Sequence, residues 1–136
     1  MREDDMLVQA SLDARTHAYA PYSKFRVGAA VLTTDGTIFT GCNVENVTFG
    51  MTTCAEQTAV LKAVSEGHRG FVRIAVCTEK SPPATPCGLC RQMLAEFCDD
   101  IGIILVNPTG DREYTRLSDI FPHAFRPRDL IGEAAD

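Results

Sequence analysis

The spacing of apolar and polar residues predicts two kinds of element along the chain. An opening helix is indicated over residues 6–18, where Met6, Ala10 and Ala14 recur at helical intervals ahead of Pro21. Short runs rich in apolar residues indicate strands at 25–32, 37–41, 71–78 and 101–107, with a further short strand near 113–116. Two more helices are predicted at 54–65 and 87–97, and the chain is expected to end in a short helix and a tail.

The order of these elements predicts a layered α/β fold. Asp35-Gly36, between the first two strands, is typical of a tight antiparallel hairpin. Residues 71–107 form a strand, helix, strand unit, which implies a parallel pair with a right-handed crossover. The run at 101–107 is almost wholly apolar, as expected where helices cover both faces of a sheet. We therefore expect a three-layer α/β/α sandwich with a mixed sheet of about five strands, built as one domain by residues 1–136.

Composition and charge narrow the choice of partners. The 136 residues carry 18 acidic and 13 basic side chains, a net charge of -5, which argues against a protein that grips a phosphate backbone. Residues 1–5 are acidic where a signal peptide would be basic. The longest strongly apolar stretch, residues 101–106, is far too short to span a bilayer. We therefore expect a cytoplasmic protein with neither a nucleic acid nor a membrane as partner.

The cysteines supply the candidate chemistry. There are six, at positions 42, 54, 77, 87, 90 and 98, and in a reducing compartment they favour metal binding or thiol chemistry over disulfides. Two patterns, Cys54-Ala55-Glu56 and Pro86-Cys87-Gly88-Leu89-Cys90, each stand at a predicted helix start, with Thr53 and Thr85 as expected N-caps. Pro86 suits the first helical position. If both helix starts face one crevice, three thiolates could hold a zinc ion and leave its fourth position open, as catalytic sites do.

Each pattern taken alone has other interpretations. Thr53-x-x-Glu56 also fits a capping box, in which Glu56 only closes the helix end. Cys87-x-x-Cys90 could be a redox pair, or half of a structural zinc site completed by Cys54 and another cysteine. The other cysteines, which are Cys42, Cys77 and Cys98, also fit small buried hydrophobic residues. A metal-free thiol redox protein would leave Cys54 and Glu56 without a role.

The joint pattern resembles a known family. C-x-E followed about 30 residues later by P-C-x-x-C is similar to the zinc deaminase signature in its three-cysteine form. Residues 20–30, 41–46 and 86–92 resemble the entry, nucleoside-binding and second zinc segments of the small homotetrameric cytidine deaminases. The resemblance covers roughly residues 10–125. It implies hydrolytic deamination of free cytidine and 2'-deoxycytidine to uridine and 2'-deoxyuridine, with release of ammonia, in pyrimidine salvage.

The same resemblance assigns roles to single residues. It implies that Cys54, Cys87 and Cys90 hold one zinc ion per subunit, and that Glu56 carries a proton from water to N3 of the base. The substrate contacts it implies are base packing by Phe25, ribose binding by Asn43 and Glu45, base-edge recognition by the Ala55 backbone, and entry of Phe125 into a neighbouring subunit's site of a homotetramer.

One position departs from the family pattern. In many relatives an arginine follows the catalytic glutamate and donates to the zinc sulfurs, whereas here the residue is Gln57, which brings no charge. Arg91, directly after Cys90, is a candidate to supply the missing positive charge.

A related zinc deaminase acting on another aminopyrimidine nucleoside, such as a blasticidin-like antibiotic, stays open as an alternative substrate class. A polynucleotide deaminase would need a basic channel, and Arg126-Pro127-Arg128 is too small a cluster for one.

Overall fold

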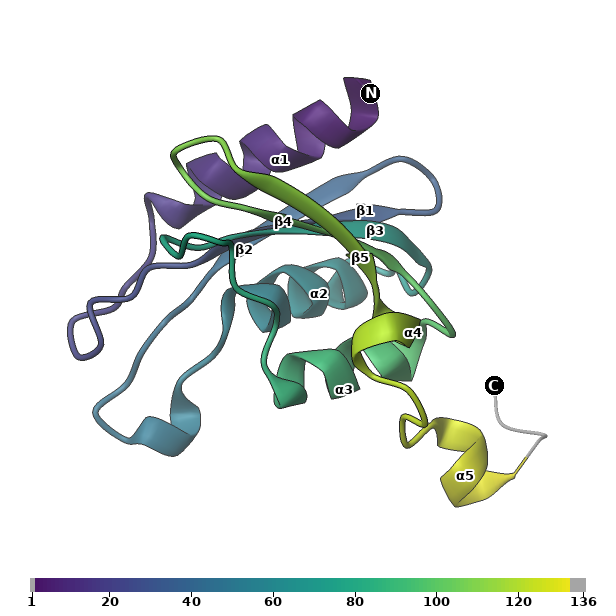
Figure 1. The fold of residues 1–136 in the computed structure, drawn as a ribbon. Coiled ribbons are helices and arrows are strands. Elements are labelled where there is room, and N and C mark those ends of the chain that lie inside the picture. Colours follow the sequence, from purple (N-terminus) through teal and green to yellow (C-terminus); the bar gives the residue numbers. More distant parts are fainter. Residues whose placement is uncertain (1, 133–136) are drawn as a thin grey trace.

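The computed structural model describes residues 2–132, and its strands form one five-stranded sheet (Figure 1). The strands are β1 (Gly28–Thr33), β2 (Ile38–Cys42), β3 (Phe71–Cys77), β4 (Gly102–Val106) and β5 (Arg112–Arg116). They lie in the order β2-β1-β3-β4-β5. Only β3 and β4 are parallel, and the other neighbouring pairs are antiparallel. The predicted mixed sheet of about five strands is therefore confirmed.

Helices cover both faces of this sheet. They are α1 (Arg2–Arg15), the 3-10 turn η1 (Phe49–Met51), α2 (Ala55–Ser65), α3 (Gly88–Phe97), α4 (Leu117–Ile120) and α5 (Pro127–Ile131). Figure 1 shows α1 on one face, with α2 and α3 on the other, so the three-layer arrangement is also confirmed. The short terminal helix is α5, and the expected tail beyond residue 132 lies outside the described residues. Among residues 2–132, no helix combines the length and apolarity needed to cross a membrane.

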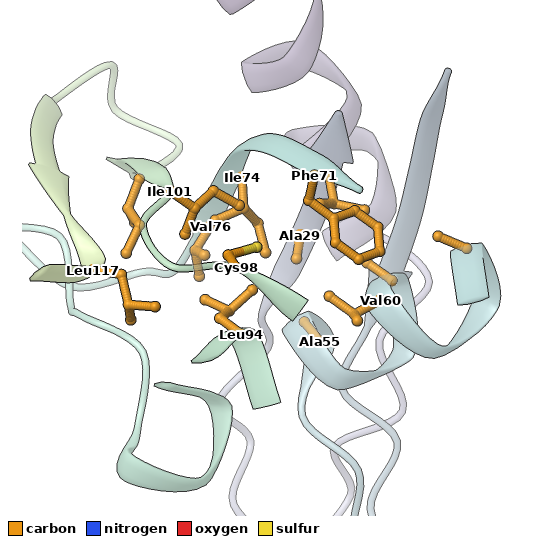
Figure 2. Close-up of a cluster of buried hydrophobic side chains, with 14 of the residues drawn as sticks. Ala29, Ala55, Val60, Phe71, Ile74, Val76, Leu94, Cys98, Ile101 and Leu117 are labelled. Carbon is orange, nitrogen blue, oxygen red and sulfur yellow. The ribbon is translucent and has the colours of Figure 1, made fainter. Parts of the chain in front are cut away.

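The apolar core is divided by the sheet into two halves. Successive strand side chains point to opposite faces, so Ala29 and Val31 of β1 pack toward α2 and α3, whereas Ala30 and Leu32 pack toward α1. β3 and β4 alternate in the same way, which explains why β4 is apolar along its whole length. Figure 2 shows the larger half, where α2 and α3 pack against the sheet. Because α2 and α3 share this core, their N-termini are fixed relative to each other.

Two sequence predictions about element boundaries were wrong. The first helix begins at Arg2 and buries Leu7, Val8, Ser11 and Ala14, while Met6 is 56% exposed, because a neighbouring face of the same helix carries the larger apolar side chains. The first strand begins at Gly28 and not at residue 25. Residues 25–27 are instead held as a loop by hydrogen bonds from the side chain of Asn43, which directly follows β2.

Candidate functional site

Three cysteine sulfurs converge at the N-termini of α2 and α3. The Sγ atoms of Cys54 and Cys87 are 3.9 Å apart, those of Cys87 and Cys90 are 3.4 Å apart, and all three lie within 4.8 Å of one another. A tetrahedral zinc ion with bonds of about 2.3 Å to sulfur separates its thiolate ligands by about 3.8 Å. The sulfur spacing and the donor chemistry therefore fit a zinc ion with three cysteine ligands.

The helix starts place these sulfurs. Cys54 and Cys87 are themselves the N-cap residues, with extended backbone conformations, so the predicted caps Thr53 and Thr85 and the predicted helical Pro86 each lie too early. The two threonines have other partners: the Thr53 backbone pairs with Val44, and the Thr85 hydroxyl accepts a hydrogen bond from Arg91. With cysteine at the cap, each sulfur lies beside the positive end of its helix, which favours the thiolate.

The three thiols differ in burial, and Cys54 and Cys90 differ in pKa. Cys90 is buried, Cys54 is half-buried and Cys87 is exposed. A hydrogen bond from the Cys90 thiol lowers the pKa of Cys54 to about 7. The same hydrogen bond, together with burial, raises the pKa of Cys90. A thiol of lowered pKa, Cys54, thus lies beside one of raised pKa, Cys90, and metal binding would require the ligating sulfurs as thiolates.

Glu56 is a buried carboxyl group beside the cluster. It is the second residue of α2, is 5% exposed and lies in the wall of the adjacent cavity. Burial raises the pKa of Glu56, because the charged form is poorly solvated there. The capping role is taken by Gln57, whose Oε1 accepts a hydrogen bond of 3.0 Å from the Cys54 backbone N–H. Glu56 is therefore not needed to cap the helix and is placed to exchange protons with a molecule in the cavity.

A cavity of about 270 Å³ opens beside the sulfur cluster. Its size is slightly below the range of about 300 to 1,000 Å³ in which small-molecule sites usually fall. Seven residues predicted from the sequence line it, namely Phe25, Asn43, Glu45, Cys54, Ala55, Glu56 and Cys87. Candidate ligand-binding and metal-binding groups thus meet in one small space.

Asn43 shapes the cavity wall by holding a loop. It is 8% exposed; its Nδ2 donates to the Phe25 carbonyl (2.7 Å), and its Oδ1 accepts from the Val27 N–H (2.9 Å). These two bonds keep residues 25–27 out of the strand and leave Phe25 36% exposed. Phe25 is therefore a ring at the cavity and not the buried start of a strand.

Glu45 presents a charged acceptor from the same wall. Its carboxylate accepts hydrogen bonds from the Tyr22 N–H (2.9 Å), the Ser23 N–H (3.1 Å) and the Ser23 hydroxyl. The Ser23 hydroxyl in particular holds the pKa of Glu45 below its usual range. The group is thus a fixed carboxylate at neutral pH, suited to accept hydrogen bonds from hydroxyl groups.

Four predicted residues lie outside the cavity wall, namely Cys90, which belongs to the sulfur cluster behind it, and Gln57, Arg91 and Phe125. Arg91 donates to three oxygens, on Thr85, Pro86 and Ile120, and within residues 2–132 neither its side chain nor that of Gln57 donates a hydrogen bond to a cysteine sulfur; the contact of Gln57 with the Cys54 sulfur is through its backbone N–H. Phe125 is 58% exposed, which excludes a place in the core. Its carbonyl accepts a hydrogen bond of 2.6 Å from Gln92, so its backbone is attached to α3 while its ring faces away from the core.

The remaining cysteines and one missed residue complete the picture. Cys42, Cys77 and Cys98 are free thiols, burial raises their pKa values, and in the described part of the chain they stand apart from the metal-holding group. Thr78, which sequence reasoning missed, is buried in the cavity wall, and its hydroxyl accepts hydrogen bonds from the backbone at Lys80 and Ala84. Its place after a parallel strand was the available signal, because ligands bind beyond the carboxyl ends of such strands.

Comparison with known proteins agrees with this geometry. Residues 1–105 match the family model described as the cytidine and deoxycytidylate deaminase zinc-binding region. The chain is 50% identical over 127 residues to a cytidine deaminase of Sporosarcina psychrophila (93% of each chain), and 46% identical over 126 residues to one of Halalkalibacterium halodurans (92% of this chain and 96% of the relative). The crystal structure of the cytidine deaminase from Burkholderia pseudomallei superposes with a TM-score of 0.86 at 45% identity, covering 89% of this chain and 98% of that one. The chain belongs to the cytidine and deoxycytidylate deaminase zinc-binding family.

Proposed function

We propose that this protein catalyses the hydrolytic deamination of cytidine and 2'-deoxycytidine to uridine and 2'-deoxyuridine, releasing ammonia. The observation that carries the proposal is the buried carboxyl group of Glu56 in the wall of the same small cavity as Cys54 and Cys87. The relatives named cytidine deaminase align over nearly the whole chain, which supports this substrate over another aminopyrimidine nucleoside such as a blasticidin-like antibiotic.

Cys54, Cys87 and Cys90 are the proposed ligands of one zinc ion per subunit. A zinc ion held there would supply a Lewis acid that makes water acidic enough to lose a proton near neutral pH. Glu56 takes that proton, transfers it to N3 of the base as water adds at C4, and then helps the amino group leave as ammonia. Its burial suits this task because a raised pKa lets the carboxyl group hold a proton between the two steps.

The other cavity residues bind and orient the nucleoside. Asn43 and Glu45 are proposed to contact the ribose hydroxyls, for which the fixed carboxylate of Glu45 is a strong acceptor. Phe25 packs on the base. Ala55, the first residue of α2, contacts the base edge through backbone groups at a helix end, where N–H groups lack helical partners. Gln57 adjusts the zinc site by holding the Cys54 backbone and adds no charge to it.

Assembly and cellular role are part of the same proposal. We infer a homotetramer in which Phe125 enters the cavity of a neighbouring subunit, in keeping with its exposed ring. Val47, Phe49 and Leu89 are each about three-quarters exposed, which supports burial of these apolar side chains by other subunits. Six free cysteines suit a cytoplasmic location, and deamination of free nucleosides would serve pyrimidine salvage. The single sheet shared by the described elements supports one domain.

The test is a chromatographic assay of cytidine with the purified protein, whose zinc content is measured first. The parent should form uridine, and Glu56→Ala should lose about 100-fold to 10,000-fold in rate, the usual contribution of a general acid–base group. Glu66→Ala, an exposed glutamate just after the same helix, is the matched control and should leave the rate unchanged.

Two results would contradict the proposal. A folded, zinc-loaded parent that forms no uridine would exclude cytidine as the substrate and direct the assay to other aminopyrimidine nucleosides. A protein that purifies without zinc and takes none up would instead favour the metal-free thiol redox alternative.

A further inference from the structure

We infer that Arg91 is a positioning residue, which holds the chain around the second cysteine pair by its three-point geometry and not by its charge. The inference rests on the proposed zinc ligands. In the sequence, Arg91 stands out only as a cation next to Cys90, a candidate to offset thiolate charge. Its contacts indicate a different task.

The first contacts close a ring around Cys87. The Arg91 backbone N–H donates to the Cys87 carbonyl (3.0 Å) as part of the first turn of α3. From the same residue, Nε donates to the Pro86 carbonyl (2.8 Å) and Nη2 to the Thr85 hydroxyl (3.1 Å). One residue thus fixes Cys87 and the two residues before it. Thr85 also lines the cavity, so this ring connects the metal centre to the wall of the substrate site.

A fourth contact, the third made by the side chain, ties this ring to another element. Nη1 of Arg91 donates to the carbonyl of Ile120, the last residue of α4, at 2.7 Å. α4 is itself anchored at its start, where Asp100 accepts hydrogen bonds from both the backbone and the hydroxyl of Ser118. The Arg91 guanidinium therefore spans α3, the segment that enters it and α4, which Figure 1 shows beside α3.

Geometry and charge make different demands on the side chain. The three acceptors of Arg91 are neutral oxygens, and they lie in three directions that a planar guanidinium can satisfy at once. Lysine has the same charge but is a compact group on a flexible stem and cannot bridge the same three oxygens. If the charge of Arg91 matters, Arg91→Lys should hold zinc as the parent does. If the three side-chain hydrogen bonds matter, Arg91→Lys should hold zinc less well.

The chain offers a matched control at the opposite end of the same helix. Arg126 also donates to three oxygens, with Nη1 to the carbonyls of Ala95 (3.0 Å) and Cys98 (2.6 Å) and Nη2 to the carbonyl of Asp99 (2.9 Å). Removing it should loosen the C-terminal end of α3, away from the three proposed zinc ligands. If only general helix stability matters, replacing either arginine should affect zinc binding equally. If Arg91 positions the metal ligands, only its replacement should do so.

The experiment measures the rate at which zinc leaves the zinc-loaded protein for a chromophoric chelator. Arg91→Lys and Arg91→Gln should both release zinc about tenfold faster or more, as substitutions behind metal ligands commonly do. Arg126→Gln should stay within about twofold of the parent. In protein loaded with Co²⁺ in place of zinc, the thiolate-to-cobalt absorption band should shift in Arg91→Lys and not in Arg126→Gln.

Three outcomes would overturn the inference. Parent-like zinc release from Arg91→Lys with fast release from Arg91→Gln would show that charge suffices. Equally faster zinc release from Arg126→Gln would show a general effect of helix stability. Unchanged zinc release from both Arg91 variants would show that the three hydrogen bonds of Arg91 are dispensable. If Arg91→Gln does not fold, Arg91→Lys still decides the question, because it keeps the stem and the charge. The measurement needs no substrate, so it is independent of the cytidine assay.

Discussion

Gly41→Ala should move the helix that carries half of the proposed site. Gly41 is buried in β2 directly under α2. A Cβ atom at this position would lie 2.6 Å from the Ala55 carbonyl oxygen, 2.8 Å from Cβ of Thr58 and closer still to the Ala59 backbone nitrogen. Ordinary contact begins at 3.4 Å, so the Ala59 nitrogen, and α2 with it, would have to retreat by about 1 Å. Such overpacking costs about 1–3 kcal/mol of unfolding free energy.

The same shift should reach the chemistry. α2 begins with Ala55 and Glu56 and is capped by Cys54, so a retreat of nearly 1 Å displaces a zinc ligand and the proton carrier together. Misplacements of about 1 Å can cost about 100-fold in rate. We expect urea unfolding of Gly41→Ala to show the loss in stability, and kcat/KM for cytidine to fall by about tenfold to 100-fold at a temperature where the variant is folded.

The control separates stability from site geometry. Gly36 lies at the hairpin tip with φ of 91°, and a Cβ atom there would have open space for 4 Å around it, so Gly36→Ala strains the backbone without a clash. It should cost about 1–2 kcal/mol of stability and leave kcat/KM unchanged. Parent-like turnover in Gly41→Ala would refute the link between β2–α2 spacing and the site. Reduced turnover in Gly36→Ala would mean that stability alone explains the effect.

Two further predictions concern stability. Burial opposes the charge on Asp100, but hydrogen bonds from Arg116 and Ser118 outweigh it and hold its pKa at about 2. Asp100 therefore contributes stability above pH 3.8 that is lost as the pH falls toward 2. Because its side chain is about one-third exposed, Asp100→Asn should lower the free energy of unfolding by only about 1 kcal/mol at pH 7, measured by urea unfolding. A difference between variant and parent that stays constant down to pH 2 would contradict this. His123 has φ of 59° without being glycine, so His123→Gly should raise the unfolding free energy by about 0.5–1 kcal/mol, and a lower melting temperature would refute it.

The sequence was most informative where the chemistry depends on short spacings. Cys54-x-Glu56 and Cys87-x-x-Cys90 each fit within one helical turn, so their local geometry follows once a helix begins there. The crossover between β3 and β4, which the strand, helix, strand order predicts, places α3 and its cysteines. The convergence of the two patterns was only a condition at that point, because it also depends on how α2 packs between β2 and β3. The face of α1 was less certain because Met6 and Leu7 both lie on plausible apolar stripes, and only packing against the sheet selects between them.

The sequence could not predict contacts that depend on distant chain segments. Asn43 holds the backbone of Phe25 across 18 positions, and Arg91 reaches Ile120 across 29. In each case a side chain replaces a hydrogen bond that regular secondary structure would otherwise supply, and no local pattern marks its partner. Their residue types, an amide and a guanidinium, are equally common on exposed surfaces, so only the fold distinguishes a brace from a solvated side chain.

The attachment of the C-terminal segment to α3 has a consequence for its evolution. Arg91 and Gln92 both bind this segment through main-chain carbonyls, at Ile120 and Phe125. Every amino acid supplies a carbonyl, so substitutions at these two positions leave the anchoring bonds available. Selection can therefore act on the exposed ring at position 125, and on whatever it contacts, without detaching the segment that carries it. The fold thus places the ring at position 125 directly beside a tether that does not depend on side-chain identity.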